Sequence, residues 1–231
     1  MGNIAIVKNE KKIQDKIYQS FQDNLKKDNA NLEVLLGLSG GLDSCVLLHL
    51  LAQMQTQLHF KLKVIHIHHG LSSSADGWLD FCKEKCKLLD IEFYDVKVKI
   101  NNKSTLGIEG EARKLRYEAI KKKQKGIVAL GHHQNDQAET LMLQLLRGSG
   151  LRGLAAMPEF DEKRKFWRPM LNIKKELIEK YASENNIEYI EDESNEDVNF
   201  DRNFFRKKVL PLIESRYPAS IETISLSLIH I

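Results

Sequence analysis

The order of apolar and polar positions along the chain predicts strands that alternate with helices. Short apolar runs and one alternating stretch predict strands at 34–38, 63–67, 92–100 and 127–130. Helical spacing of apolar residues predicts helices at 8–30, 45–51, 79–90, 107–125 and 173–185. A further helix is expected from 202, interrupted or restarted at Pro211. Strands and helices in this order favour an α/β fold, with a doubly wound, mostly parallel sheet and helices on both faces.

Composition narrows the class of protein. A chain of 231 residues with a mass of 26.6 kDa is long enough for one domain with a substantial core. Its net charge of +3 permits nucleic-acid binding without requiring it. The absence of an apolar N-terminal segment and of any membrane-length run predicts a cytoplasmic protein without a membrane partner. The cysteines at 45, 82 and 86 form no disulfide framework, and no second pair completes a metal site.

The turn after the first predicted strand is the strongest candidate for chemistry. Adjacent glycines at 40 and 41 allow the main chain to approach an anion at the start of the next helix. Ser39 and Ser44 add hydroxyl donors, and Asp43 adds a carboxylate suited to Mg²⁺ among phosphate oxygens. The turn lacks the Lys-Ser/Thr ending of a Walker A loop, and its glycines are not spaced as in a dinucleotide fingerprint.

Two histidine-rich segments follow later strands. The first is 66–70, and the second is 131–140, with the sequence GHHQNDQAET. Ligands of doubly wound sheets lie beyond the carboxyl ends of strands, so both segments are expected to share the crevice of the glycine turn. Asp136 and Glu139 also have the spacing of a capping box, a purely structural helix start. The pattern alone therefore leaves open whether Glu139 caps the helix or contacts a ligand.

Basic residues suggest contacts with phosphate. Arg113 stands at the beginning of a predicted helix, where a cation is unfavourable unless an anion is near. Segment 147–154 is basic and punctuated by glycines, which suits a substrate-binding loop. Trp167, beside Arg168, is either a base-stacking residue or a core anchor. Residues 202–208 place basic side chains at both ends of a Phe pair, which suggests one packed face and one face toward phosphate.

Together these strings resemble one enzyme family. SGGLDS at 39–44 resembles the PP-loop of the N-type ATP pyrophosphatases, whose fold is described as adenine nucleotide alpha hydrolase-like. Over about 34–211 the chain resembles the tRNA(Ile)-lysidine synthetase family. The resemblance rests most on 131–157, and also on HHGLSSSADGW, EGEARKLRY, RPML, EDESN and DRNFFRKKVLP. It implies a ligase that uses ATP and Mg²⁺ to adenylate C2 of the wobble cytidine in tRNA(Ile) with a CAU anticodon. Free L-lysine then displaces AMP.

The resemblance also implies roles for individual residues. The catalytic set is Asp43, Arg113, Asp136 and Arg206, of which Asp43 and Asp136 hold Mg²⁺. The ATP-binding set is Ser39, Gly40, Gly41, Asp43, Ser44, His66, His69, Gly131 and His132. The lysine-binding set is His133, Asp136 and Glu139. The tRNA-binding set is Arg147, Arg152, Arg168 and Arg202.

The chain departs from this family in two respects. Phe205 stands where an aliphatic residue is common, which is a mild change. Members of the family usually carry helical domains after the catalytic one. We therefore expect a catalytic domain at 1–215, with an N-terminal helix and a C-terminal helical segment, and a tail at 216–231 truncated before those domains. A homodimer is left open.

Two other functions deserve comparison. A PP-loop tRNA thiolase makes the same adenylate but attacks it with sulfur, typically using a Cys-x-x-Cys pair or another reactive cysteine. Here the spacing is Cys82-x-x-x-Cys86, and Cys45 lies in an apolar helix. A non-catalytic ATP-binding module would need fewer charges than Asp43, Arg113 and Asp136 provide together. Both alternatives are less favoured than the ligase.

Overall fold

The computed structural model describes residues 2–25, 32–68, 70, 74–99, 107–150, 154 and 157–227. Its centre is a six-stranded sheet with the strand order β3-β2-β1-β4-β6-β5. The strands are β1 (Leu32–Gly37), β2 (Phe60–His68), β3 (Glu92–Lys97), β4 (Ile127–Ala129), β5 (Phe160–Asp161) and β6 (Phe166–Trp167). All neighbouring strands are parallel except β5 and β6, which form an antiparallel edge. The predicted doubly wound, mostly parallel α/β architecture is confirmed.

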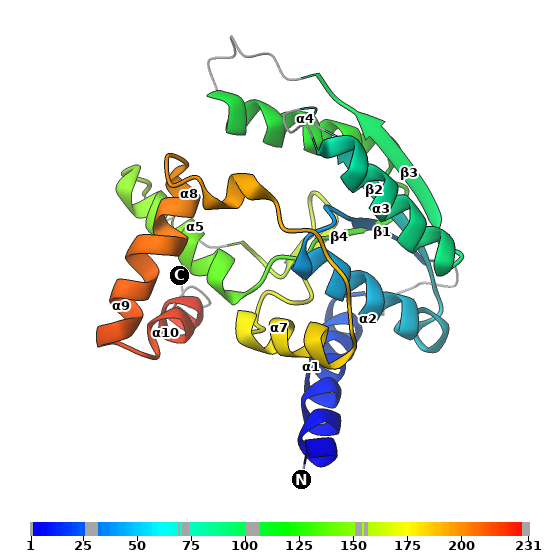
Figure 1. The fold of residues 1–231 in the computed structure, drawn as a ribbon, viewed down its shortest axis with the longest axis horizontal. Helices are drawn as coiled ribbons and strands as arrows, with labels where there is room; N and C mark the ends of the chain where they lie inside the picture. Colours follow the sequence, from blue (N-terminus) through cyan, green and yellow to red (C-terminus); the bar gives the residue numbers. More distant parts are fainter. Residues whose placement is uncertain are drawn as a thin grey trace.

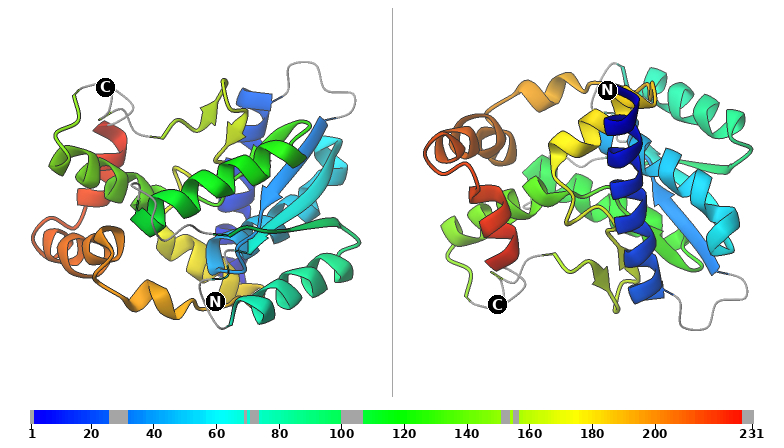
Figure 2. Two further views of the ribbon diagram at one scale, coloured as in Figure 1. Left: turned by 90° about the horizontal axis from the view of Figure 1, so that it is seen from above. Right: turned by 90° about the horizontal axis from the view of Figure 1, so that it is seen from below.

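Helices cover both faces of this sheet (Figures 1 and 2). They are α1 (Gly2–Leu25), α2 (Leu42–Leu58), α3 (Ala75–Leu88), α4 (Gly107–Lys123) and α7 (Lys175–Glu184). Strand β1, in the centre of the sheet, shows why helices must cover both faces. Val34 and Leu36 pack into a core with α1, α2, α3 and α7, whereas Leu35 packs into a second core with α4. Successive side chains of a strand point to opposite faces, so an unbroken apolar run must be covered twice.

The connections reverse direction at β1. The chain moves outward through α2, β2, α3 and β3, and then returns through α4 to β4 on the other side of β1. The carboxyl ends of β1 and β4 therefore flank a topological switch point, the usual position of a ligand in such sheets. The glycine turn follows β1, and α5 (Gln134–Leu146) begins shortly after β4. Both predicted site segments thus lie at the same edge.

A smaller group of helices lies beside the sheet and packs against α5 (Figure 1). It comprises α8 (Asp201–Phe204), the π-helical turn η2 (Phe205–Val209), α9 (Leu210–Arg216) and α10 (Ser220–Ser227). Pro211 lies in the first turn of α9, where a missing N–H is tolerated, so the helical path continues through it. Ala138, Leu210 and Ile221 form the buried contact that holds this group to α5.

Several boundaries differ from the predictions. The first helix is described from Gly2 to Leu25, so its predicted end at 30 lies outside the described residues, and α2 extends well beyond the apolar run 45–51. The edge strands β5 and β6 and the helix α10 were not predicted, while the acidic segment 188–197 contains a short 3₁₀ helix, η1 (Glu193–Glu196). In the described segments no helix combines the length and apolar character needed to cross a bilayer.

Candidate functional site

The glycine turn is shaped by its own hydroxyls. The Ser39 and Ser44 hydroxyl oxygens lie 3.0 Å apart, and the Ser44 hydroxyl donates to the Gly41 carbonyl at 3.0 Å. Gly40 has a φ of +92°, a backbone conformation that favours glycine, and an added Cβ would also lie 3.2 Å from the Ile190 side chain. No side chain caps α2 at Gly41. The turn therefore presents an uncapped helix start, which favours an anion.

The second site segment is organised by a capping interaction that differs from the predicted one. Helix α5 begins at Gln134 with His133 as its N-cap, and the Asp136 carboxylate accepts the His133 N–H at 2.9 Å. One of the two interpretations that the pattern left open made Asp136 the N-cap, paired with Glu139. That interpretation is wrong by one turn, because His133 already has the extended backbone of a cap residue. Asp136 thus has a structural role, and Glu139 has no part in the cap.

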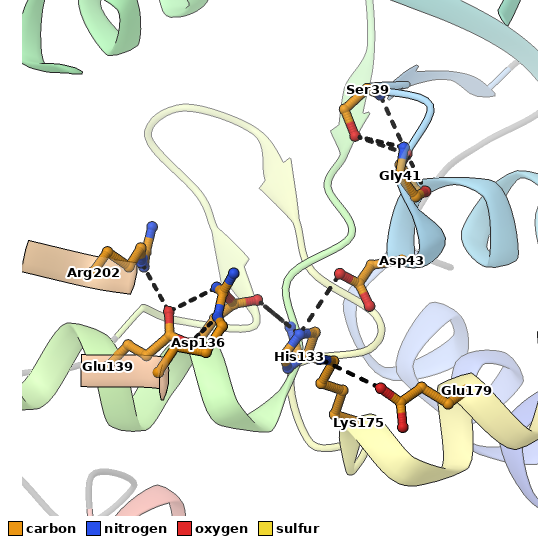
Figure 3. A network of polar contacts seen from close by, with 11 residues as sticks. Ser39, Gly41, Asp43, His133, Asp136, Glu139, Lys175, Glu179 and Arg202 are labelled. Atoms are coloured by element: carbon orange, nitrogen blue, oxygen red, sulfur yellow. Dashed lines mark hydrogen bonds and ion pairs between the residues drawn. The ribbon is translucent and has the colours of Figure 1, made fainter. Parts of the chain in front are cut away.

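The two segments meet at His133 (Figure 3). Its Nε2 lies 3.7 Å from Asp43 Oδ2 and 3.7 Å from Asp136 Oδ2. The close approach depends on Gly131, because an added Cβ would lie 3.2 Å from the Asp43 carbonyl carbon and 3.3 Å from the Ser44 nitrogen. The glycine turn and the start of α5 therefore form one site, as the topology requires.

Burial and neighbouring charges give the two carboxylates different acidities. Burial raises the pKa of Asp43, and the nearby Asp136 charge raises it further, while His133 opposes the shift. Burial also acts to raise the pKa of Asp136, but His133, His132 and Arg202 outweigh it and lower that pKa. Asp136 consequently remains ionised more firmly than Asp43, whose charge is stabilised by any added cation.

Unpaired polar atoms mark where a ligand would be held. Asp43 Oδ1 and His133 Nδ1 are buried and accept or donate no hydrogen bond. In the part of the chain that the structure describes, no set of three His, Cys, Asp or Glu side chains is arranged to hold a metal ion. Asp43 has one oxygen without a partner and lies close to the carboxylate of Asp136, which fits Mg²⁺, because this ion is typically bound through one or two carboxylates together with substrate phosphates.

Glu139 lies in a clasp formed by two arginines. Its side chain is 0% exposed. Arg206 donates from Nε to Oε1 at 2.7 Å and from Nη2 to Oε2 at 2.9 Å, while Arg202 donates from Nε to Oε2 at 3.0 Å. Arg206 also reaches Asp136 at 3.5 Å. Both oxygens of Glu139 are therefore occupied, and an ammonium group would have to replace an arginine to reach them.

Two further basic residues, Arg113 and Arg168, differ in their exposure to solvent. Arg113 is exposed on α4, with its guanidinium 5.3 Å from the centre of the Tyr117 ring. Burial lowers the pKa of His132 to about 4, and the charges of Arg168 and Arg113 contribute to that shift. Arg168 is only 4% exposed and donates to the Pro158 carbonyl at 2.8 Å. The expectation that Arg168 faces tRNA therefore disagrees with its burial.

The remaining candidates divide between surface, core and undescribed positions. His66 is buried, with its Nδ1 2.9 Å from the Leu38 carbonyl oxygen, so it links the ends of β1 and β2. Arg147 is exposed and forms a 3.4 Å ion pair with Asp201. Trp167 is a core residue whose Nε1 donates to Ser20 at 2.9 Å. His69 and Arg152 lie outside the described residues.

Sequence reasoning missed Lys175, at the start of α7. Figure 3 shows it beside His133, where it forms a 3.3 Å ion pair with Glu179. Its positive charge lowers the pKa of Asp43, although more weakly than His133 does. No local pattern identifies this residue as part of the site, because a lysine in the first turn of an amphipathic helix is ordinary. Only the packing of α7 against α2 brings it there.

Comparison with known proteins identifies a matching domain family and several similar curated proteins. The PP-loop domain family matches residues 9–213. The chain is 42% identical over 219 residues to a tRNA(Ile)-lysidine synthase from Histophilus somni (strain 2336), covering 93% of this chain and 51% of the relative. It is 47% identical over 186 residues to the corresponding protein of Neisseria meningitidis serogroup B, covering 79% and 43%. The chain thus spans about half the length of these curated relatives.

Among solved structures, the fold is similar to a U34-tRNA thiolase from Methanococcus maripaludis, which was determined with its [4Fe-4S] cluster. The TM-score is 0.78 and the sequence identity is 19%, covering 96% of this chain and 79% of the other. At that identity the likeness supports a shared fold.

Proposed function

The chain belongs to the PP-loop domain family, and from this premise we propose that it converts the wobble cytidine of tRNA(Ile) to lysidine. The first step joins the C2 oxygen of the cytidine to the α-phosphate of ATP and releases pyrophosphate. In the second, the amine of free lysine attacks C2 and AMP leaves. The 42% and 47% identities to lysidine synthases support this choice of reaction. One geometric observation carries it: Asp43, His133 and Asp136 meet beside an uncapped helix start at the switch point.

The glycine turn is proposed to bind the phosphates of ATP. The backbone amides at the start of α2, with the hydroxyls of Ser39 and Ser44, would hold the leaving pyrophosphate. Gly131, His132, His66 and His69 are proposed to line the adenosine side of the same site. Asp43 and Asp136 would hold Mg²⁺, which when bound neutralises charge on the phosphate oxygens. Arg113, exposed on α4, would offset the same developing charge.

The residues near His133 are proposed to receive the amine. His133 Nε2 lies between two carboxylates and is positioned to accept the proton that the attacking amine loses. Glu139 remains our candidate partner for an ammonium group, on the condition that Arg202 or Arg206 releases it. Arg206, freed in that way, would turn its charge toward the phosphates. Arg147, which is exposed, and Arg152 are proposed to contact tRNA. Arg168 is less suited to that role because it is buried, and Arg202 because it is paired with Glu139.

The cysteines make sulfur transfer a weaker candidate. Cys82 and Cys86 are fully buried, and burial raises the pKa of Cys86 to about 12 and the pKa of Cys82 further. Burial also raises the pKa of Cys45 to about 11. A thiol must lose its proton to act as a nucleophile or to bind a metal, and these thiols remain protonated at neutral pH.

The proposed function is tested by pyrophosphate release, with ATP, lysine and tRNA(Ile) each omitted in turn. ATP and tRNA are expected to suffice for adenylate formation, whereas release of AMP should also require lysine. Asp43→Asn should abolish both steps while leaving the unfolding curve unchanged, and Asp80→Asn, exposed on α3, is the matched control. Turnover that depends on a sulfur donor instead of lysine would assign the chain to the thiolases. ATP binding without turnover would indicate a binding module.

A further inference from the structure

Two buried thiols lie directly beneath the glycine turn, although the proposed reaction does not use them as nucleophiles. Cys45, near the start of α2, is 2% exposed, and Cys82 on α3 is 0% exposed. The Cys45 thiol donates to the Gly40 carbonyl oxygen at 3.2 Å. An added Cβ on Gly40 would lie 3.3 Å from the Cys82 Sγ, so the second thiol fills the space beside this glycine. The turn therefore rests on sulfur atoms from two helices.

The segment that follows α7 reaches the same point of the turn. The Ile190 N–H donates to the Gly40 carbonyl oxygen at 2.9 Å, so this oxygen has a second donor besides the Cys45 thiol. A carbonyl oxygen has two lone pairs, and both are therefore used. Gly40 itself is buried, whereas Gly41 is half-buried and Ser39 is exposed. The two donors thus hold the carbonyl on the buried side of the turn.

Anchoring this carbonyl fixes the direction of the next amide. In a trans peptide the C=O and N–H groups lie in one plane and point in opposite directions, and the described residues contain no cis peptide bond. Because the Gly40 oxygen points into the protein, the Gly41 N–H points outward, at the uncapped start of α2. It donates to the Ser39 hydroxyl at 3.3 Å, slightly beyond the usual range for such a bond (Figure 3). This amide is therefore well placed to donate to an anion.

The Cys45 thiol acts as a donor because it keeps its proton. Burial raises the pKa of Cys45 to about 11, so the group is a neutral S–H at physiological pH. A thiolate could only accept, and it would repel the carbonyl oxygen that the thiol now holds. Cys86 provides a comparison within the same molecule. It belongs to the same buried cluster and is 0% exposed, but it is not among the nearest neighbours of Gly40.

These contacts give a buried thiol a part in phosphate binding. We propose that Cys45 is a positioning residue: its S–H group, together with the Ile190 amide, holds the Gly40 carbonyl inward so that the next amide faces a bound phosphate. This inference rests on the proposed function, in which the glycine turn binds the phosphates of ATP. Cys45 itself touches no phosphate, and no bond to sulfur forms or breaks. Cys82 supports the same turn by packing alone.

The test measures binding of pyrophosphate, with MgCl₂ present, to the whole chain by calorimetry. Cys45→Ala removes the donor, whereas Cys45→Ser keeps a donor on a small side chain, so the pair isolates the hydrogen bond. Cys86→Ala is the matched control, because it removes a sulfur atom from the same buried cluster. Cys45→Ala should weaken pyrophosphate binding about three- to tenfold, which is part of the contribution of one charged hydrogen bond. Cys45→Ser and Cys86→Ala should stay within about twofold of wild type. Thermal unfolding should show similar decreases in Tm for the two alanine variants, which separates positioning from a loss of packing.

Three results would overturn the positioning role: wild-type affinity in Cys45→Ala, a serine variant as weak as the alanine variant, or an equal loss in Cys86→Ala. Turnover assays separate this from a failure of the proposed function. In Cys45→Ala the KM for ATP should rise while the KM for lysine stays unchanged. If wild type turns over with lysine and Cys45→Ala keeps its KM for ATP, the positioning role is wrong and the function stands. If the pyrophosphate affinities differ as expected and no turnover depends on lysine, the function is wrong and the positioning role stands. Wild-type protein that binds no pyrophosphate would overturn this inference together with the proposed phosphate site.

Discussion

Replacing Glu139 with Gln tests whether the arginine clasp stabilises the fold. The substitution keeps the shape of the side chain but removes a fully buried charge that receives three hydrogen bonds from Arg202 and Arg206. A glutamine oxygen can still accept from one arginine, whereas its NH₂ group faces the donors of the other. Both guanidinium groups would then remain partly buried without a full counter-charge.

The expected cost follows from that geometry. Removing one partner of a buried ion pair typically destabilises a protein by about 3–5 kcal/mol. The arginine side chains are 24% and 32% exposed, so water screens part of the loss and the lower end applies. We therefore expect a decrease in the free energy of unfolding of about 3 kcal/mol. For a chain of this length that corresponds to a decrease in Tm of roughly 6–12 °C.

Urea denaturation followed by circular dichroism measures this change. The matched control is Asp201→Asn, which breaks the exposed 3.4 Å pair with Arg147 and should change stability by no more than about 0.5 kcal/mol. A change below about 1 kcal/mol for Glu139→Gln, with an unaltered m-value, would refute the clasp as a stabilising element. Glu139 would then be held only loosely and would be free to bind a ligand without displacing an arginine.

Three further predictions follow from the site. Gly131→Ala should lower the free energy of unfolding by about 1–2 kcal/mol and weaken ATP binding, because the new Cβ meets the Asp43 main chain at 3.2 Å; wild-type values in both assays would contradict the close approach. Cys45 and Cys86, with pKa values raised to about 11 and 12, should resist iodoacetamide in native protein at pH 8 and react in urea; rapid native labelling would contradict this. Burial lowers the pKa of His132 to about 4, so the unfolded chain takes up the proton at a higher pH than the folded protein does. The free energy of unfolding should therefore fall as the pH decreases from about 6.5 to 4, by at most about 3 kcal/mol. His132→Gln should remove that part of the pH dependence, and an unchanged slope would contradict this.

Local patterns were informative where one physical requirement dominates. The apolar run at 34–38 requires two covered faces, which is why the α/β class and the helices on both sides could be predicted from it. The edge strands β5 and β6 were missed because two residues are too few to show a period. The cap of α5 was misplaced by one turn because Asp136 and Glu139 match the spacing of a capping box, while His133 gives no such sequence signal.

The sequence by itself determined the class of fold and the chemical types present at the site: a glycine turn with Ser39, Asp43 and Ser44, and a histidine-acid segment at 131–140. Those depend on short-range sterics and on periodicity, which the order of residues contains directly. Only the tertiary structure decided the partners. It brought Asp43 to His133, buried Arg168, and closed Arg202 and Arg206 on Glu139. Such pairings join residues more than 60 positions apart, and they are set by helix packing around the sheet, which no local window of sequence contains.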